Sequence, residues 1–420
     1  MTATIAAATT PRSLWQVADF RRLWIGETTS ALGSSVTAVA LPLVALTGLH
    51  AGVVAVSLLS AAAWLPWLLI GLPAGAWVDR LPRRPVMMAC DAVSMILFAS
   101  VPVAAYLGVL TLAQLLIVAL LSGTAKVFAT TAYRAFLPAV VGEEHLVEGN
   151  SRLQGGESAA QVAGPGLGGV IAQLLGAATG LVADAVSFAV SLACLRRITA
   201  VEPRPQRERR PLRAEIGDGL RFLRGDRLLR RLTLFGGAAN LALTGFGAIE
   251  VAFLVRELRL GSAAVGGVLA ATSAGGVAGA VIAPALVRRL GSARALLLCK
   301  AGTTPAALLI PLAGRGWGLV PFVVGTVVPV AGIVAGNVVS GGFFQRYVPR
   351  DLMGRVSTAM QVVNFGAIPV GALLGGQLAD RLGYRAALWL LLGGLVAATP
   401  LLIGALGGRR DLPTRPAEAS

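Results

Sequence analysis

Long apolar runs, separated by short polar connectors, constrain this chain more than any other feature. Of its 420 residues, 55% are hydrophobic and 13% are charged, whereas a soluble domain carries about 25% charged residues. A helix needs about 20 mostly apolar residues to cross the bilayer core. By that length we expect an all-α membrane protein with twelve transmembrane helices, near residues 22–46, 52–78, 86–107, 111–134, 154–176, 179–196, 232–255, 263–287, 293–313, 318–342, 355–379 and 384–406.

The arginines predict how these spans are oriented. With the N-terminus in the cytoplasm, 29 of the 36 Lys and Arg residues fall in cytoplasmic segments and five in external ones, as the positive-inside rule requires. The other two, Lys126 and Lys300, fall within spans. The N-terminus lacks an apolar core followed by a small-residue cleavage site, so the first span is expected to direct insertion. We therefore expect a multi-pass protein of a bacterial inner or plasma membrane, with both termini cytoplasmic.

The chain also contains an internal repeat. Four short motifs recur in order after 207 to 211 residues: Arg21-Arg22-Leu23 with Arg230-Arg231-Leu232, Asp79-Arg80-Leu81 with Arg288-Arg289-Leu290, Pro138 with Pro349, and Gly168-Gly169 and Gly176 with Gly375-Gly376 and Gly383. Duplicated six-helix units are typical of transporters whose halves rock around a site near the bilayer midplane. The repeat predicts an N-terminal six-helix bundle (1–195), a basic cytoplasmic linker (196–231), a C-terminal six-helix bundle (232–408) and a cytoplasmic tail (409–420).

Composition argues against several other classes of protein. The net charge of +16 is spread between apolar runs rather than gathered on one basic domain, which disfavours nucleic-acid binding. The three cysteines lie far apart, which favours neither a disulfide framework nor a metal site. Neither lysine belongs to a Walker A loop, and the two histidines are distant in sequence, so a nucleotide-driven pump and a histidine-based enzyme are not expected. We expect no cofactor, only a proton gradient, and a monomer.

Two short stretches carry a family resemblance. The segment GLPAGAWVDRLPRR (71–84) resembles the motif between helices 2 and 3 of the major facilitator superfamily, and the chain resembles that superfamily over essentially its whole length. The segment AGPGLGG (163–169) is similar to the end of a glycine-proline motif of its exporters and antiporters. The segments 20–26 and 183–188 resemble its enterobactin-exporter and macrolide-efflux branch. The motif residues are Gly71, Gly75, Asp79, Arg80, Arg83, Arg84, Gly164, Pro165, Gly168 and Gly169.

The sequence departs from these family patterns at four positions. Pro82 stands where the first motif usually has glycine, and Ser151 and Ala160 replace upstream glycines of the second. Ala119 stands where many proton-linked members carry an arginine. This last departure weakens a direct transfer of the usual proton-coupling scheme.

Each motif has a plain interpretation and a functional one. The arginines after the second span can simply mark the cytoplasmic side. The resemblance also implies that Asp79 latches the first half to the cytoplasmic end of helix 11 in the outward-facing state. The glycines around Pro165 can serve ordinary helix packing, or form a stiff bend that favours export.

Six ionisable residues within spans are candidates for proton coupling or ion pairing. Glu27, Asp91, Lys126 and Glu157 are expected in one layer, roughly 5 to 12 Å below the cytoplasmic boundary at 1.5 Å per residue. One lysine cannot neutralise three acids, so at least one carboxyl would favour taking up a proton. Glu27 or Glu157 is the expected proton carrier if the layer is coupled; the alternative is a static ion-pair network, to which Asp91 is most expected to belong.

Asp184 and Glu250 are expected nearer the external face, as functional acids, as parts of an external gate or as snorkelling side chains. Glu250 is the better candidate for a cavity, because helices 1, 4, 7 and 10 surround the path in the family that this chain resembles. The cavity candidates are mostly polar or aromatic residues of the spans: Trp64, Asn240, Thr244, Phe246, Asn337, Gln361 and Asn364. So few polar groups suit a lipophilic or amphipathic molecule better than a sugar.

These observations favour a secondary exporter of a drug, antibiotic, siderophore or other natural product, working by proton antiport and alternating access. Two alternatives remain. The first is an importer or facilitator of a small metabolite without obligate antiport. The second is a membrane sensor or assembly factor that transports nothing.

Overall fold

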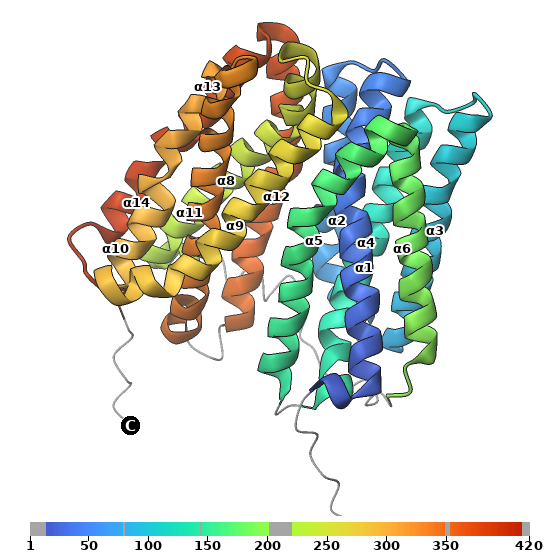
Figure 1. Ribbon diagram of the computed structural model, residues 1–420. Coiled ribbons are helices and arrows are strands. Elements are labelled where there is room, and N and C mark those ends of the chain that lie inside the picture. The colour runs from blue at the N-terminus through green and yellow to red at the C-terminus, as the bar shows by residue number, and fades with distance from the viewer. Residues whose placement is uncertain (1–13, 79, 143–144, 201–220, 349–352, 414–420) are drawn as a thin grey trace, which may run out of the picture.

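The computed structural model is a bundle of long helices in two sets, with α1 to α6 on one side and α8 to α14 on the other (Figure 1). It describes residues 14–78, 80–142, 145–200, 221–348 and 353–413. Asp79, residues 201–220 of the predicted linker and both chain ends lie outside the described residues.

The first set packs through contacts of α1 with α5 and α6, of α4 with α2 and α3, and of α3 with α6. Its helices are α1 (Ala18–Leu43), the π-helical turn η2 (Val44–Gly48), α2 (Val53–Val78), α3 (Arg83–Tyr106), α4 (Leu112–Val141), α5 (Leu146–Leu175) and α6 (Ala177–Arg197).

The second set packs through contacts of α8 with α12 and α13, and of α11 with α9 and η6. Its helices are α8 (Arg227–Ala252), the π-helical turn η4 (Phe253–Glu257), α9 (Ser262–Leu290), α10 (Ser292–Leu297), the π-helical turn η5 (Leu298–Gly302), the 3₁₀ segments η6 (Thr304–Leu312) and η7 (Gly316–Leu319), α11 (Val320–Tyr347), α12 (Met353–Leu382), α13 (Tyr384–Ala397) and α14 (Thr399–Leu406).

In the described part of the chain, 11 helical segments are long and apolar enough to cross a membrane. The all-α membrane fold predicted from the sequence is thus confirmed, whereas a count of twelve crossings stays a prediction. Helix α5 has 30 residues but is not one of these 11 apolar segments. Its first half carries Glu148, Arg152 and Glu157, which lower its hydropathy, and its packing against α1 and α9 shields it.

Several helices extend beyond the predicted spans. Helix α4 ends at Val141 rather than 134, and α5 begins at Leu146 rather than 154. The added part of α4 (135–141) is apolar but follows Arg134 and contains Pro138, and the added part of α5 (146–153) carries Glu148 and Arg152. Backbone hydrogen bonding continues through both segments. Lys126 consequently lies about 22 Å from the end of its helix, at 1.5 Å per residue, which is further from it than the sequence predicted.

The internal repeat extends to details of the backbone. The π-helical turns η2 and η4 end the first helix of each set and are 209 residues apart. Each is followed by a non-glycine residue with positive φ, His50 (52°) and Arg259 (54°). Gly176 (φ 88°) and Gly383 (φ 84°) make the one-residue junctions between α5 and α6 and between α12 and α13. Left-handed backbone suits glycine, because a Cβ would be strained there.

Contacts between the two sets run from the middle of the helices toward one end. We call the end at which α1 begins and α6 ends the basic end, since it carries Arg22, Arg84 and Arg197. The sets meet through α5 with α9 and through α2 with α12. Gln173 Oε1 accepts a hydrogen bond from the Ala263 amide (3.0 Å), away from the basic end. Toward the basic end the two sets of ribbons diverge (Figure 1).

Candidate functional site

The predicted layer of charges is assembled from four helices of the first set. Glu27 on α1 lies within electrostatic reach of Asp91 on α3, Glu157 on α5 and Lys126 on α4. Lys126 and Glu157 are exposed, whereas Asp91 is buried. Because the carboxyls outnumber the lysine, this cluster can exchange a proton or hold a fixed charge pattern, as the sequence allowed.

Two members of the layer differ in their surroundings. Glu157 accepts hydrogen bonds along α5 from the side-chain amides of Gln154 (3.3 Å) and Gln161 (3.2 Å). Asp91 lies on α3, which packs against α6, and its buried Oδ2 atom has no hydrogen-bond partner among the described residues. Asp91 therefore lies within the helix packing, and Glu157 on an exposed surface of α5.

Asp184 lies inside the contact between α1 and α6 and is fully buried. Its two carboxylate oxygens accept hydrogen bonds from Thr37 Oγ1 (2.6 Å) and Ser187 Oγ (3.1 Å). Gly33 on α1 leaves room for this group, because a Cβ there would stand 2.7 Å from Ser187 Cβ. With both oxygens satisfied and no exposure, Asp184 is placed to stabilise the packing of α1 on α6.

Glu250 lies on α8, two turns before the end of the η4 turn that continues this helix. This part of the helix is distant from the basic end. The Glu250 Oε1 atom is buried and has no hydrogen-bond partner in the described part of the chain. Nearby Phe246 and Phe253 stack around Phe322 on α11, with centroids 6.2 and 6.0 Å away. The carboxyl thus sits close to an aromatic cluster that joins α8 to α11.

The first motif places its arginines at helix ends. Arg84 donates to the last carbonyls of α6, at Leu195 (2.8 Å) and Arg196 (2.7 Å). Arg22 donates to Arg197 (2.6 Å) in the same place. A cation at a helix C-terminus satisfies unpaired carbonyls and the helix dipole, a role that sequence reasoning missed. Gly71 and Gly75 lie in α2, Arg80 is exposed and Arg83 begins α3, but the predicted latch by Asp79 lies outside the described residues.

The second motif divides its residues between two neighbours. Gly164 and Gly168 face α1, where a Cβ would meet Ser35 and Val36. Gly169 and the carbonyl of Pro165 face Gly266 on α9, in the other set. The motif thus brings three helices together, and sequence reasoning did not find Gly266.

The predicted cavity residues fall into three groups. Asn240 donates to the Asn364 carbonyl (3.1 Å), which ties α8 to α12. Trp64 is 40% exposed, beside Trp67, which contacts Phe365 across the two sets (5.6 Å). The remaining group includes the half-buried Thr244, the buried Phe246, and the exposed Gln361 and Asn337. The structure therefore brings Asn240 on α8 and Asn364 on α12 into contact, whereas Trp64 lies on α2 and Asn337 on α11.

Lys300, which was not among the predicted site residues, contacts the predicted cavity residue Asn337. Lys300 Nζ donates to Asn337 Oδ1 (3.0 Å). The sequence signal was present, since an ionisable side chain within a span is a functional candidate by default.

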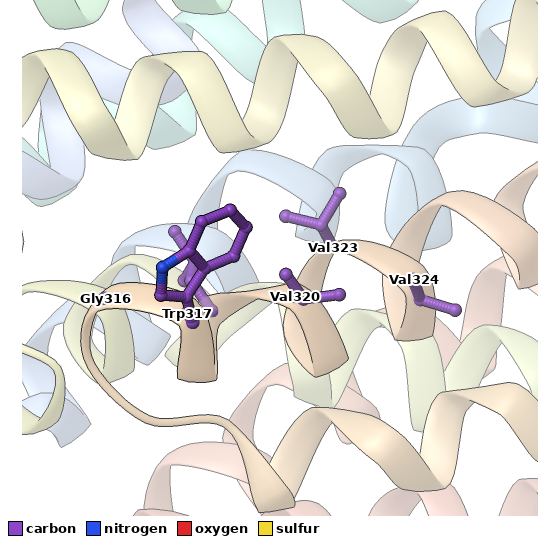
Figure 2. Close-up of a pocket in the computed structure, with 6 residues that line it drawn as sticks. Gly316, Trp317, Val320, Val323 and Val324 are labelled. Atoms are coloured by element: carbon purple, nitrogen blue, oxygen red, sulfur yellow. The ribbon is translucent and has the colours of Figure 1, made fainter.

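The hollow in Figure 2 lies elsewhere, at the start of α11, and has a volume of about 510 Å³. Gly316, Trp317, Val320 and Val324 line it, and none of the predicted site residues does. Trp317 is 92% exposed, as expected for a tryptophan of the membrane interface. We assign this apolar surface to contact with lipid rather than to the transport path. Among the described residues, no group of three His, Cys, Asp or Glu side chains could hold a metal ion.

Comparison with known proteins agrees with this architecture. The family model described as "Transmembrane secretion effector" matches residues 9–418. The chain belongs to that family. Proteins with a similar sequence include the multidrug efflux pump Tap of Mycolicibacterium fortuitum, 30% identical over 85% of this chain and 88% of that protein. The enterobactin exporter EntS of Shigella boydii is 26% identical over 77% of this chain and 79% of its own length.

A similar fold occurs in the crystal structure of a mutant of the nucleoside transporter NupG, with a TM-score of 0.78 and 11% identity over 92% of this chain and 99% of that one. At this identity the likeness concerns the fold alone. Together with the family match, the relatives confirm that the chain is a membrane transporter of the major facilitator superfamily, similar to multidrug and siderophore exporters.

Proposed function

We propose that this protein is a secondary active exporter of a lipophilic or amphipathic small molecule, driven by proton antiport and working by alternating access. The similarity to Tap and EntS over most of each chain carries this proposal. Mostly apolar helices with few polar groups support an apolar or amphipathic cargo.

The proposed orientation places the basic end in the cytoplasm. Arg22, Arg84 and Arg197 gather there, and arginine is retained on the cytoplasmic side of bacterial membranes. Helix α5 then makes the twelfth crossing, shielded by α1 and α9. Both termini accordingly face the cytoplasm.

In this orientation the described conformation is an inward-facing one. Contacts between the halves, such as Gln173 with Ala263 and Gly169 with Gly266, lie away from the basic end. Alternating access requires a second state in which these contacts separate and the basic ends meet. We assign the latch of that second state to Asp79, the residue that follows α2 in the sequence.

Proton coupling is assigned to the charge layer. Glu27 interacts electrostatically with Lys126 on α4 and with Glu157 on α5, so protonation of Glu27 changes the charge balance between α1, α4 and α5. Such a change can bias two conformations only if it favours one of them. We therefore expect that the carboxyl of Glu27 or Glu157 is accessible from one side of the membrane in one conformation and from the other side in the second.

The test is efflux from cells and uptake into inverted vesicles under an imposed pH gradient, across a panel of hydrophobic drugs. Wild-type vesicles should accumulate at least one compound, and collapse of the gradient should abolish the accumulation. Asp79→Asn and Glu27→Gln should each lower it severalfold. Glu148→Gln, which removes an acid paired with Arg152 at the start of α5, is the matched control and should behave as wild type. Accumulation that ignores the gradient, or survives both substitutions, would contradict this mechanism.

A further inference from the structure

Lys300 lies at an irregular point of a membrane-spanning segment. The segment 292–312 begins as α10 and continues as the π-helical turn η5, where Lys300 is located. Pro305 follows and cannot donate a backbone hydrogen bond. The hydroxyls of Thr303 and Thr304 donate instead to the carbonyls of Cys299 and Lys300 (2.7 and 2.5 Å). Single π-helical turns within helices are frequent at functional sites.

The Lys300 side chain runs across a neighbouring helix. A Cβ added to Gly336 on α11 would stand 2.7 Å from Lys300 Cγ and 2.8 Å from Cε. Gly336 therefore provides the groove in which the lysine stem lies. Beyond it, Nζ donates to Asn337 Oδ1 (3.0 Å). The Lys300 stem thus lies across α11, and its ammonium group reaches the exposed Asn337.

Asn337 follows Gly336 on α11, in the part of this helix that meets η5. Phe322, near the start of α11, packs its ring against Phe246 of α8 and Phe253 of η4. At 100° per residue, Asn337 lies within about 60° of Phe322 around the helix axis. Asn337 lies 15 residues after Phe322, nearer the C-terminal end of α11.

The charge at this point is uncompensated. In the described part of the chain, no carboxylate lies within ion-pair distance of Lys300. An ammonium group has three donors, of which one is used on Asn337. Since Asn337 turns its oxygen to the lysine, its amide nitrogen is available as a further donor. An unpaired cation among apolar helices is costly unless an anion joins it.

The internal repeat makes Lys300 and Asn337 equivalent in position to two residues of the charge layer in the first half. Lys300 follows Asp91 by 209 residues, and Asn337 follows Lys126 by 211, within the range of the other repeated positions. The first half thus has an acid where the second half has a lysine. Asp91 is buried in the packing of α3 on α6, so the repeat gives Lys300 a counterpart of opposite charge but no equivalent binding surface.

We propose that Lys300 and Asn337 bind an oxyanionic group of the transported molecule, so that the cargo is an amphipathic compound bearing a carboxylate or a similar acidic group. This proposal specifies the substrate class of the proposed exporter. It rests on the proposed function, because only that function makes the bound molecule the transported one. The ammonium supplies the charge and the Asn337 amide the second donor.

The test is a fluorescence titration of the purified full chain with dansyl-labelled undecanoic acid and with its primary amide, which share one apolar body. The wild type should bind the acid about tenfold more tightly than the amide, as expected for charge-assisted hydrogen bonds. Lys300→Met should remove this preference while its affinity for the amide stays unchanged, which also shows that it is folded. Asn337→Ala should reduce the preference in part. Arg381→Met, which removes an exposed cation in the last turn of α12, should retain it.

Equal affinity of the wild type for acid and amide would overturn the proposal, and so would a preference that survives Lys300→Met. Loss of both probes in Lys300→Met would assign the lysine to helix packing and would equally overturn it. The titration uses no gradient and no transport. Its outcome is therefore independent of the vesicle experiment that tests export.

Discussion

Gly169 on α5 and Gly266 on α9 lie against each other across the two halves: a Cβ added to either would stand 2.8 Å from the Cα of the other. Small residues allow helix backbones to approach this closely in membranes. Gly169 belongs to a motif that the sequence singled out, whereas Gly266 is one of many glycines in α9. Their contact lies away from the basic end and joins the halves there.

We expect Gly266→Ala to loosen this contact, because its methyl group would overlap Gly169 and the Pro165 carbonyl. Spin labels on α5 and α9 near this end, in a background without the three native cysteines, should then report longer distances. Gly267→Ala is the matched control, since a Cβ at Gly267 meets nothing within 4 Å. Equal distance distributions in the two variants would show that the glycine contact does not hold the halves together.

Asp184→Asn is expected to destabilise the protein rather than to alter coupling. The substitution weakens charge-assisted hydrogen bonds from Thr37 and Ser187 in a fully buried site, and such losses cost about 1–3 kcal/mol. Thermal unfolding in detergent should show it, with Thr37→Val giving part of the effect. Unchanged thermal stability together with lost efflux would instead place Asp184 in the transport cycle.

Glu250→Gln is expected to leave folding unimpaired. The Glu250 Oε1 atom is buried without a hydrogen-bond partner among the described residues, and a neutral amide of similar shape costs less to bury than a carboxylate. If Glu250 carries a proton, the variant should still bind substrate but lose the dependence of efflux on the pH gradient. Glu257→Gln, at an exposed partner of Arg385, serves as the control. A strong loss of thermal stability in Glu250→Gln would contradict this expectation.

Asp411 is expected to make the contact of the C-terminal segment with α10 sensitive to acid. The backbone amide of Ser292, with help from its hydroxyl, holds the pKa of Asp411 below its usual range (hydrogen bonds of 2.9 and 3.2 Å). A depressed pKa stabilises the folded contact at higher pH, and this stabilisation is lost as pH falls through the folded pKa.

Hydrogen exchange of the Ser292 amide, corrected for its intrinsic rate, should therefore speed up below about pH 4, where the unfolded carboxyl titrates. Asp411→Asn should exchange faster at neutral pH and lose this acid dependence. A rate in the variant that matches the wild type at neutral pH would show that the carboxylate does not hold this junction.

The basic architecture was predictable from the sequence because partition into a bilayer depends on local composition. Runs of about 20 apolar residues and the bias of the arginines predicted helical spans, and the motifs at 71–84 and 163–169 predicted the family. Helix ends were less predictable. Segment 135–141 is apolar but follows Arg134 and contains Pro138, and segment 146–153 carries Glu148 and Arg152. Nothing in hydropathy shows whether a helix continues past such residues.

The composition of the site depended on tertiary structure. Asp184 was identifiable as an acid within a span, but only the packing of α1 on α6 gave it Thr37, 147 residues away. Lys300 was equally visible as a lysine in a span, yet the glycine groove that carries it to Asn337 exists only where η5 meets α11. Sequence thus determined which segments enter the membrane, since that is a property of each segment alone. Which charges are paired, buried or left open was decided by the contacts between helices, because pairing requires distant residues to meet.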